Sequence, residues 1–368
     1  MNKTHATDRL YFIDAARAIA IILMLQGHFV DTLLAQRWRD SSSLIYSLWE
    51  DLRGFTAPLF FTVAGLIFSY LIFNTGSHRD PRKRIYKGYK RAAQLVAIGY
   101  LLNIPYLNWA QGIYDTEYLN VGVLQIIGCG VFLLALLHRL LIHNRLMLML
   151  INLGLGLTIF FLEPLYRDLV IPDCPLFLLN YLSKINGSGF VLFPWLGYIF
   201  IGAALGNLLS LTPTTMMARN RFLWCTITTG TLLSLYSEQF LVSMASFTGH
   251  EIFTQIAYYN YLFPRLGAVL IFLAVLMGFN RFFKHSLWYR IGGNTLSIYI
   301  VHSIILYGSI LGVGLSNWWY RSLNPPFVII GAAVFIGVCL LITGWYVALD
   351  KKKFYRHIPS YGSKLAET

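Results

Sequence analysis

The sequence predicts an all-α, polytopic integral membrane protein of about ten transmembrane helices. Three observations predict this class: 57% of the 368 residues are hydrophobic, only 12% are charged, and the mean hydropathy is +0.59. A soluble domain typically has ~25% charged residues, because its surface has to face water. A chain this poor in charge is therefore expected to place most of its surface against lipid.

Ten apolar stretches each approach the ~20 residues that a helix needs to cross the hydrocarbon core. They lie at residues 12–35, 54–74, 90–107, 121–141, 146–162, 190–210, 222–243, 264–282, 294–313 and 327–349. No internal repeat and no second soluble domain is evident in the sequence. We expect residues 1–368 to form a single transmembrane domain, with its core at about 10–350 and a basic cytoplasmic tail at 351–368.

The distribution of lysine and arginine predicts the orientation. With the N-terminus inside, 21 of the 29 Lys and Arg residues fall on cytosolic segments and six on outer segments. Short cytoplasmic loops carry such an excess in inner-membrane proteins. The formal net charge of +13 could suggest nucleic acid, but the basic residues lie in short loops beside apolar runs. We expect both termini in the cytoplasm, an inner membrane as the location, and no nucleic-acid partner.

Arg17 and His28 lie eleven residues apart in the first apolar stretch. Eleven residues are about three helical turns, so both side chains point to roughly the same face, ~16 Å apart along the axis. Ionisable groups are costly in hydrocarbon and usually serve a function there. His28 is predicted to act as a general base, with a hydrogen bond to a neighbouring helix as the alternative. Asp31, three residues later on the same face, is expected to orient its ring.

Three residues are candidates for holding a cofactor. Arg17 either reaches the headgroups or contacts phosphates or a polar acyl-carrier arm, a task suited to a permanently charged planar donor. Arg91 ends the basic run at 79–91, which is either a topogenic signal or a nucleotide clamp. Gln125 is an uncharged donor and acceptor within a span, where it either joins helices or holds a substrate carbonyl or amide.

Three more residues are candidates for binding a substrate on the outer side. Arg53 ends the predicted outer loop at 36–53, which forms either an aromatic interfacial belt or a saccharide- or lipid-facing mouth. Arg265 lies at the outer start of the eighth span, and His302 lies inside the ninth, as a second proton carrier or a structural hydrogen bonder. The sequence contains no HExxH, no CxxC and no Gly-rich nucleotide fingerprint, and no metal is expected.

The chain resembles the transmembrane acyltransferase superfamily, and it is most similar to the bacterial heparan-alpha-glucosaminide N-acetyltransferase-like group, which is related to the acyltransferase type 3 family. The spacing of Arg17 and His28 within the first helix looks like the signature of that superfamily. Four further segments carry the resemblance: Arg53-Gly54-Phe55-Thr56-Ala57-Pro58-Leu59-Phe60-Phe61, Gly122-Val123-Leu124-Gln125 with Gly128, Phe193-Pro194-Trp195-Leu196-Gly197-Tyr198, and Gly292-Gly293-Asn294 through Tyr299 and His302.

The resemblance implies an enzyme that binds acyl-CoA from the cytosol and passes the acyl group to an acceptor on the far side. His28 would be the base and Arg17 would hold the CoA arm or its phosphates. In the eukaryotic lysosomal members the reactive His lies in the loop after the first helix. Residues 36–53 contain no His, so the role is assigned to His28 on the bacterial pattern.

The expected reaction is transfer of an acyl group, with acetyl favoured, from acetyl-CoA to a hydroxyl or amine of an envelope glycan or glycolipid. The alternative is a secondary transporter or flippase in which Arg17, His28 and His302 form a proton or anion path. Besides acyl-CoA, the acceptor and the lipid bilayer, a second copy of the chain is kept as a candidate partner.

Overall fold

The computed structural model describes residues 10–73, 80–213 and 215–356, and these ranges are helical and contain no β-strand. The all-α class predicted from the sequence is confirmed. The α-helices are α1 (Tyr11–Leu33), α2 (Leu44–Phe73), α3 (Pro81–Asn103), α4 (Tyr106–Ala110), α5 (Val123–Leu140), α6 (Arg145–Phe161), α7 (Glu163–Tyr166), α8 (Leu176–Leu182), α9 (Leu192–Leu211), α10 (Met216–Thr248), α11 (Glu251–Tyr258), α12 (Leu262–Gly278), α13 (Ser286–Gly293), α14 (Thr295–Tyr307), α15 (Leu315–Trp319) and α16 (Pro325–Arg356). Three short 3-10 helices are η1 (Gln36–Trp38), η2 (Glu117–Leu119) and η3 (Asn280–Lys284).

The long helices follow the predicted spans. Each predicted span falls mainly on one long helix, namely α1, α2, α3, α5, α6, α9, α10, α12, α14 and α16. In the described ranges, five helices are long and apolar enough to cross a membrane, or six if α11 and α12, bent by 59°, form one broken span. The helices α6 and α14 are apolar but shorter. The chain is thus a multi-pass membrane protein, while ten spans and the side that each terminus faces stay predictions.

Several boundaries differ from the prediction, and three of them change where loop or tail residues lie. Helix α2 begins at Leu44, inside the predicted outer loop, so that Arg53 lies on a helix. Helix α3 begins at Pro81 because the Asp80 side chain accepts a hydrogen bond from the Arg82 amide at 2.8 Å, and proline is favoured in the first turn. Helix α16 ends at Arg356 and takes in the start of the predicted tail at 351–368. The rest of that tail lies outside the described residues.

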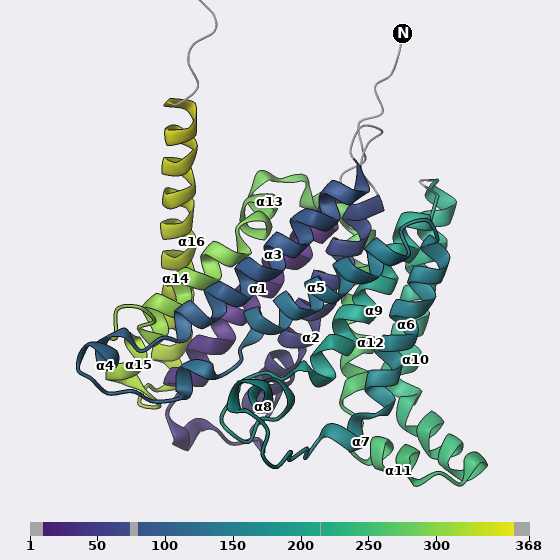
Figure 1. The fold of residues 1–368 in the computed structure, drawn as a ribbon, viewed down its shortest axis with the longest axis horizontal. Coiled ribbons are helices and arrows are strands. Elements are labelled where there is room, and N and C mark those ends of the chain that lie inside the picture. The colour runs from purple at the N-terminus through teal and green to yellow at the C-terminus, as the bar shows by residue number, and fades with distance from the viewer. Residues whose placement is uncertain (1–9, 74–79, 214, 357–368) are drawn as a thin grey trace, which may run out of the picture.

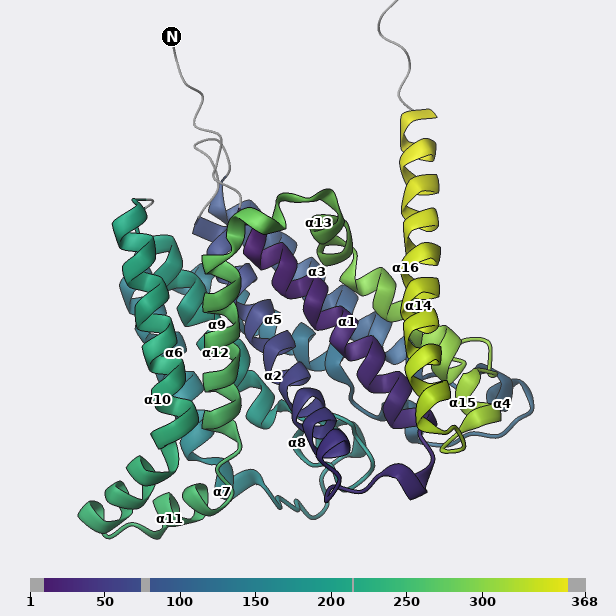
Figure 2. The ribbon, with the colours of Figure 1, turned by 180° about the vertical axis from the view of Figure 1, so that it is seen from behind.

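The helices form one bundle (Figures 1 and 2). Helices α6, α9, α10 and α12 stand together at one side, and α14 and α16 lie at the other side. Helices α1, α2, α3 and α5 lie between these groups. The short helices α4, α7, α8, α11 and α15 gather at the lower end, opposite the starts of α1 and α3.

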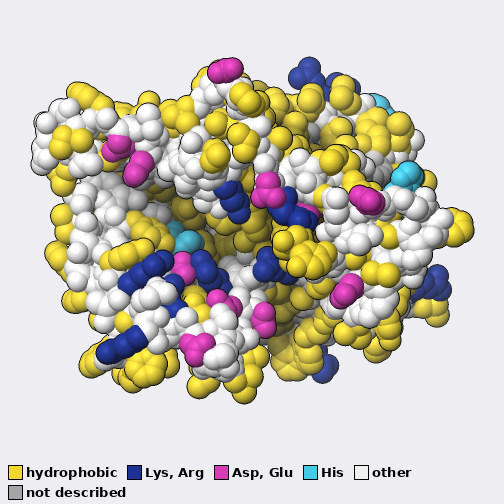
Figure 3. Space-filling model, turned by 90° about the horizontal axis from the view of Figure 1, so that it is seen from below, with side chains coloured by type: hydrophobic (Ala, Val, Ile, Leu, Met, Phe, Trp, Pro, Cys, Tyr) yellow, Lys and Arg dark blue, Asp and Glu magenta, His cyan; other side chains and the backbone are white. Residues whose placement is uncertain are grey.

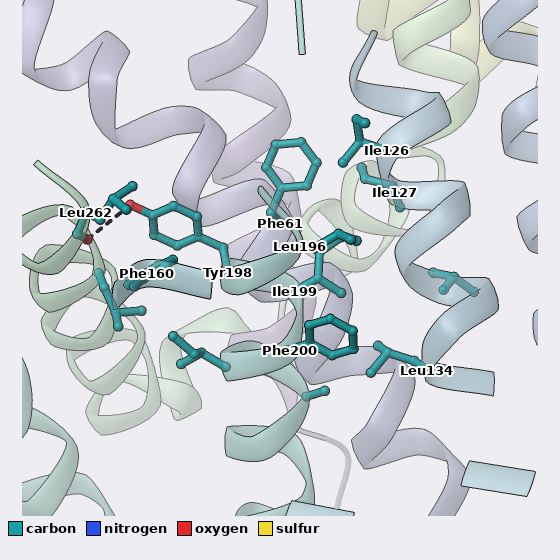
Figure 4. Packing of buried hydrophobic residues seen from close by; sticks show 14 of the residues in the cluster. Phe61, Ile126, Ile127, Leu134, Phe160, Leu196, Tyr198, Ile199, Phe200 and Leu262 are labelled. Atoms are coloured by element: carbon teal, nitrogen blue, oxygen red, sulfur yellow. Dashed lines mark hydrogen bonds between the residues drawn. The ribbon is translucent and has the colours of Figure 1, made fainter. Parts of the chain in front are cut away.

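Small residues allow the central helices to approach closely. A Cβ on Gly202 of α9 would lie 2.0 Å from the Thr62 carbonyl oxygen of α2, and one on Gly65 of α2 would lie 1.9 Å from the Ile199 carbonyl oxygen. Such contacts between backbones are typical of helices that pack within a membrane. Tyr198 also anchors α9, because its hydroxyl donates to the Leu262 carbonyl at 3.0 Å (Figure 4).

Candidate active site

A cavity of about 790 Å³ lies between α1, α2, α3, α5 and α14. Its volume falls within the ~300–1,000 Å³ that is usual for small-molecule sites. One end is formed by the last turns of α2 and the first turns of α3, at the upper end of the bundle in Figure 1. The other end lies deeper, where α2, α3, α5 and α14 meet.

The upper end of this cavity is strongly cationic. Lys83, Lys87 and Arg91 are spaced four residues apart on α3, so they share one face of the helix and all line the cavity. Arg84 lines it as well. The only carboxylate among the lining residues is that of Asp80, which already accepts a hydrogen bond as the cap of α3. The summed charge favours an anionic ligand.

Arg17 contributes a further guanidinium from α1, below the α3 residues. Its Nη2 donates to the Thr295 hydroxyl at the start of α14, at 3.3 Å. Asp14 and Arg91 are close enough to act on it electrostatically. The structure thus brings Arg17 and Arg91, which were predicted to bind a cofactor, to the same cavity.

The inner end of the cavity is apolar. Phe60, Leu95, Leu124 and Tyr299 line it from four different helices. Phe60 packs against three separate hydrophobic clusters, so it stands where the cores on either side of α2 meet. The cavity therefore has a cationic end and an apolar end. This arrangement suits a ligand with an anionic head and a less polar arm.

Gln125 does not line this cavity, although its neighbours Leu124 and Ile127 do. Its side chain is 1% exposed, and its Oε1 accepts a hydrogen bond from the Gly122 amide at 3.1 Å. It packs against Gly99 of α3. This geometry favours a role in capping the first turn of α5 and joining it to α3, which was one of the two predicted roles.

His28 lies on the second half of α1 and contacts α14. Its Nδ1 is 2.8 Å from the hydroxyl of Tyr307, and the two rings meet edge to face with centroids 5.9 Å apart. The ring of His302 lies 5.4 Å from that of His28. The imidazoles of His28 and His302 and the phenol of Tyr307 thus form one cluster between α1 and α14.

Asp31, which was expected to orient His28, has arginines as its contacts in the structure. The Asp31 carboxylate pairs with two arginines instead, through Oδ2 to Arg53 Nη2 at 2.8 Å and through Oδ1 to Arg39 Nη1 at 3.3 Å. Arg39 also donates to the Asp31 carbonyl. Spacing by three residues places a carboxylate near the imidazole, but charge-assisted bonds to two guanidinium groups compete more strongly for it. The effect of Asp31 on His28 is electrostatic.

His302 stands between His28 and the cavity. It is 1% exposed, and its Nδ1 contacts the Tyr299 carbonyl oxygen. A carbonyl oxygen only accepts, so Nδ1 carries the hydrogen and Nε2 is left as the acceptor. The ring of Tyr299, which lines the inner end of the cavity, lies 4.7 Å from that of His302. His28 is not among the lining residues, and the rings of Tyr299 and His302 connect it to the cavity.

The predicted substrate-binding arginines lie toward the opposite end of the bundle. Arg53 is half exposed and acts electrostatically on His28. Arg265 is half buried at the start of α12, 5.2 Å from the centre of the Tyr261 ring. Its Nη2 would lie 3.0 Å from a Cβ on Gly54, the residue after Arg53. Figure 3 shows this lower face hollowed, with basic and acidic side chains around the hollow and a histidine inside it.

The sequence did not single out several residues of this arrangement. The four-residue spacing of Lys83, Lys87 and Arg91 is visible in the sequence and could have revealed a common face. Phe60 and Tyr299 lie in segments that carry the family resemblance, but nothing in those segments gave them a role, because apolar and aromatic residues are common in every span. Tyr307 is 279 positions from His28, and no local pattern links them.

These features define a class of protein, a multi-pass membrane enzyme with a cation-lined cavity on one side and histidines beyond its inner end. The chain matches the family described as heparan-alpha-glucosaminide N-acetyltransferase, catalytic, over residues 9–239, and it belongs to that family. The resemblance inferred from the sequence is thereby confirmed, and the protein is a member of a membrane acetyltransferase family. No curated protein matches the chain. The matched segment contains Arg17 and His28, whereas His302 and Tyr307 lie beyond it.

Proposed function

We propose that this protein transfers an acetyl group from cytosolic acetyl-CoA to a hydroxyl or amine of an envelope glycan or glycolipid at a bacterial inner membrane. The observation that carries the proposal is the cavity that runs from the cations of α3 to Tyr299, next to His302 and His28. Membership of an acetyltransferase family supports acetyl as the transferred group.

The charge pattern of the cavity fits coenzyme A. This molecule carries its phosphates at one end and its thioester at the end of a long, flexible and mostly uncharged arm. Lys83, Lys87 and Arg91 would pair with the phosphates through charge-assisted hydrogen bonds. Arg17, deeper in the cavity, would hold the arm, and the thioester would reach the apolar end at Phe60 and Tyr299. Exclusion of water there would strengthen every polar contact to the reacting group.

His28 is proposed as the general base. It would take the proton of the acceptor O–H or N–H while the acceptor atom forms a bond to the acyl carbon. The bond between that carbon and sulfur then breaks, and the proton passes from His28 to the departing thiolate. General-base help supplies ~10²–10⁴-fold, so positioning by the arginines must supply much of the remainder. Arg53, Arg265 and His302 are assigned to the acceptor side.

The reaction is tested with membranes that contain the protein and acetyl-CoA labelled in the acetyl group. Label is expected in a glycan or glycolipid fraction, and analysis of that fraction identifies the acceptor. His28→Ala should lower the labelling by ~10²–10⁴-fold. His143→Ala is the matched control, because His143 is exposed between α5 and α6 and should label normally. Full labelling by His28→Ala would overturn the proposal.

A transporter is distinguished by ligand binding. A ligand that binds the folded state stabilises it, by ~2.7 kcal/mol at a concentration of 100 times Kd. Acetyl-CoA is therefore expected to raise the melting temperature of the purified protein. A transporter of unrelated solutes would show neither this shift nor covalent labelling of an acceptor.

A further inference from the structure

Tyr307 ends α14 at the point where its hydroxyl meets His28. Gly308 follows it with φ 70°, a left-handed conformation that closes the helix and is favourable only for glycine. The hydroxyl lies 2.8 Å from His28 Nδ1. Tyr307 as a whole residue is 42% exposed.

The Tyr307 hydroxyl oxygen also accepts a hydrogen bond from Thr32. Its hydroxyl lies one helical turn beyond His28 on α1 and donates to Tyr307 Oη in a long bond of 3.4 Å. Thr32 is 7% exposed, which keeps this hydroxyl out of contact with most water. A phenol oxygen has two lone pairs, so it can accept from Thr32 and from His28 at once.

The carboxylate that acts on the His28 ring, that of Asp31, is already paired with two arginines. The charged and titratable groups that act on His28 are Asp31 on its own helix, Arg53 on α2, and His302 and Tyr307 on α14. Asp31 is engaged by Arg39 and Arg53. His302 gives its Nδ1 hydrogen to the Tyr299 carbonyl. Tyr307 is therefore the group whose geometry fits a hydrogen bond to Nδ1.

We propose that Tyr307, held in place by Thr32, is the positioning residue for His28. Its oxygen accepts the Nδ1 hydrogen and leaves Nε2 of the same ring as the atom that takes a proton. This inference rests on the proposed acetyl transfer, and it assigns to a neutral phenol the task that a carboxylate performs in many histidine-dependent enzymes.

With this assignment, each proton in the proposed reaction has a defined position. The acceptor O–H or N–H proton moves to His28 Nε2 as the bond to the acyl carbon forms. The same proton leaves Nε2 for sulfur when the carbon–sulfur bond breaks. The Nδ1 hydrogen stays on His28 throughout, hydrogen-bonded to the Tyr307 oxygen, and neither Tyr307 nor Thr32 gains or loses a proton.

The test is Tyr307→Phe, which removes the hydroxyl and keeps the ring. We expect kcat to fall about 10- to 100-fold, a part of the ~10²–10⁴-fold that a general base supplies, with KM for acetyl-CoA within about twofold. Tyr320→Phe is the matched control, because Tyr320 is an exposed tyrosine on the segment after α15. It should leave both constants unchanged.

The pH profile distinguishes positioning from a merely structural role. A phenol that accepts the Nδ1 hydrogen favours protonated His28, because the cation is the better donor. Its loss should then move the acid limb of the profile of kcat/KM to lower pH. A phenol that donates to Nδ1 favours neutral His28, and its loss would move the limb to higher pH. A shift to higher pH, or no shift, overturns the inference.

Two variants of Thr32 complete the test. Thr32→Val keeps the shape and removes the donor, and it should move the acid limb in the same direction as Tyr307→Phe, but less. Thr32→Ser keeps the hydroxyl and should show the same pH profile as the unmodified protein. If Tyr307→Phe is fully active while His28→Ala is inactive, the positioning role fails and the acetyl transfer stands. If His28→Ala is itself fully active, the proposed function fails first.

Discussion

Tyr299 and His302 meet edge to face, with ring centroids 4.7 Å apart, and they form the boundary between the cavity and His28. Tyr299 faces the cavity, and His302 faces His28 at 5.4 Å. Both residues belong to α14, one turn apart, so a single helix forms this part of the boundary. In the proposed reaction, the acyl group would therefore lie beside Phe60 and Tyr299, on the side of the cavity that faces His302.

The cations of α3 offer a test of cofactor binding with a control on the same helix. Lys87→Ala should weaken the binding of acetyl-CoA about tenfold, because one charge-assisted hydrogen bond contributes ~1.5 kcal/mol. The effect should shrink at high salt, where charge pairs are screened. Lys90→Ala removes the same charge at a position of α3 that does not line the cavity, where the ammonium lies 4.9 Å from the centre of the Tyr86 ring. Calorimetry should find its affinity unchanged, and an equal loss in both variants would contradict the assigned cavity.

The inner end of the cavity is expected to limit the length of the acyl chain. Phe60→Leu shortens the side chain that closes this end without emptying it. A pocket distinguishes one methylene by ~10- to 200-fold, so the rate with butyryl-CoA relative to acetyl-CoA should rise about tenfold. Phe68→Leu is the control, because Phe68 lines the cavity beside Gly88, near the cationic end. A donor preference unchanged by Phe60→Leu would place the acyl group elsewhere.

The Asp31 carboxylate is expected to contribute more to the stability of the fold than to the turnover of the enzyme. Asp31→Asn removes the charge that pairs with Arg53 and with Arg39, whose side chain is 9% exposed. The free energy of unfolding should fall by about 1–3 kcal/mol, because a largely buried guanidinium is left without its counter-ion. Asp51→Asn, at an exposed position of α2, should leave the melting temperature unchanged. If Asp31→Asn instead loses turnover while its melting temperature is unchanged, Asp31 has a role in catalysis and not mainly in stability.

Close packing of α2 on α9 predicts a strong effect of one added methyl group. Gly202→Ala would bring a Cβ to 2.0 Å from the Thr62 carbonyl oxygen, so the helices would have to separate. Overpacking of this kind costs about 1–3 kcal/mol. Gly154→Ala on α6 meets nothing within 4 Å, and alanine favours a helix over glycine by ~1 kcal/mol. Thermal unfolding in detergent should show a lower melting temperature for the first variant and an equal or higher one for the second.

Apolar stretches near 20 residues predicted every long helix, because hydropathy is a local property of the chain. The boundaries were less accurate where polar residues extend a helix beyond its apolar part. Helix α2 includes the polar stretch around Glu50 and Asp51, and α3 includes the basic residues from Arg82 to Arg91. A window of hydropathy does not register these turns, although the cap at Asp80 and the proline after it indicate the start of α3.

By itself the sequence determined the helical membrane class, the family, and the presence of Arg17 and His28 on one face of the first helix. These features depend on composition, periodicity and spacing within single segments. Only the tertiary structure decided which group meets each of them. Asp31 is three residues from His28, yet it pairs with Arg39 and Arg53, while Tyr307, 279 positions away, supplies the hydrogen-bond partner of the imidazole. The reason is that hydrogen bonds depend on distance and direction in space, and the packing of α14 against α1 sets both.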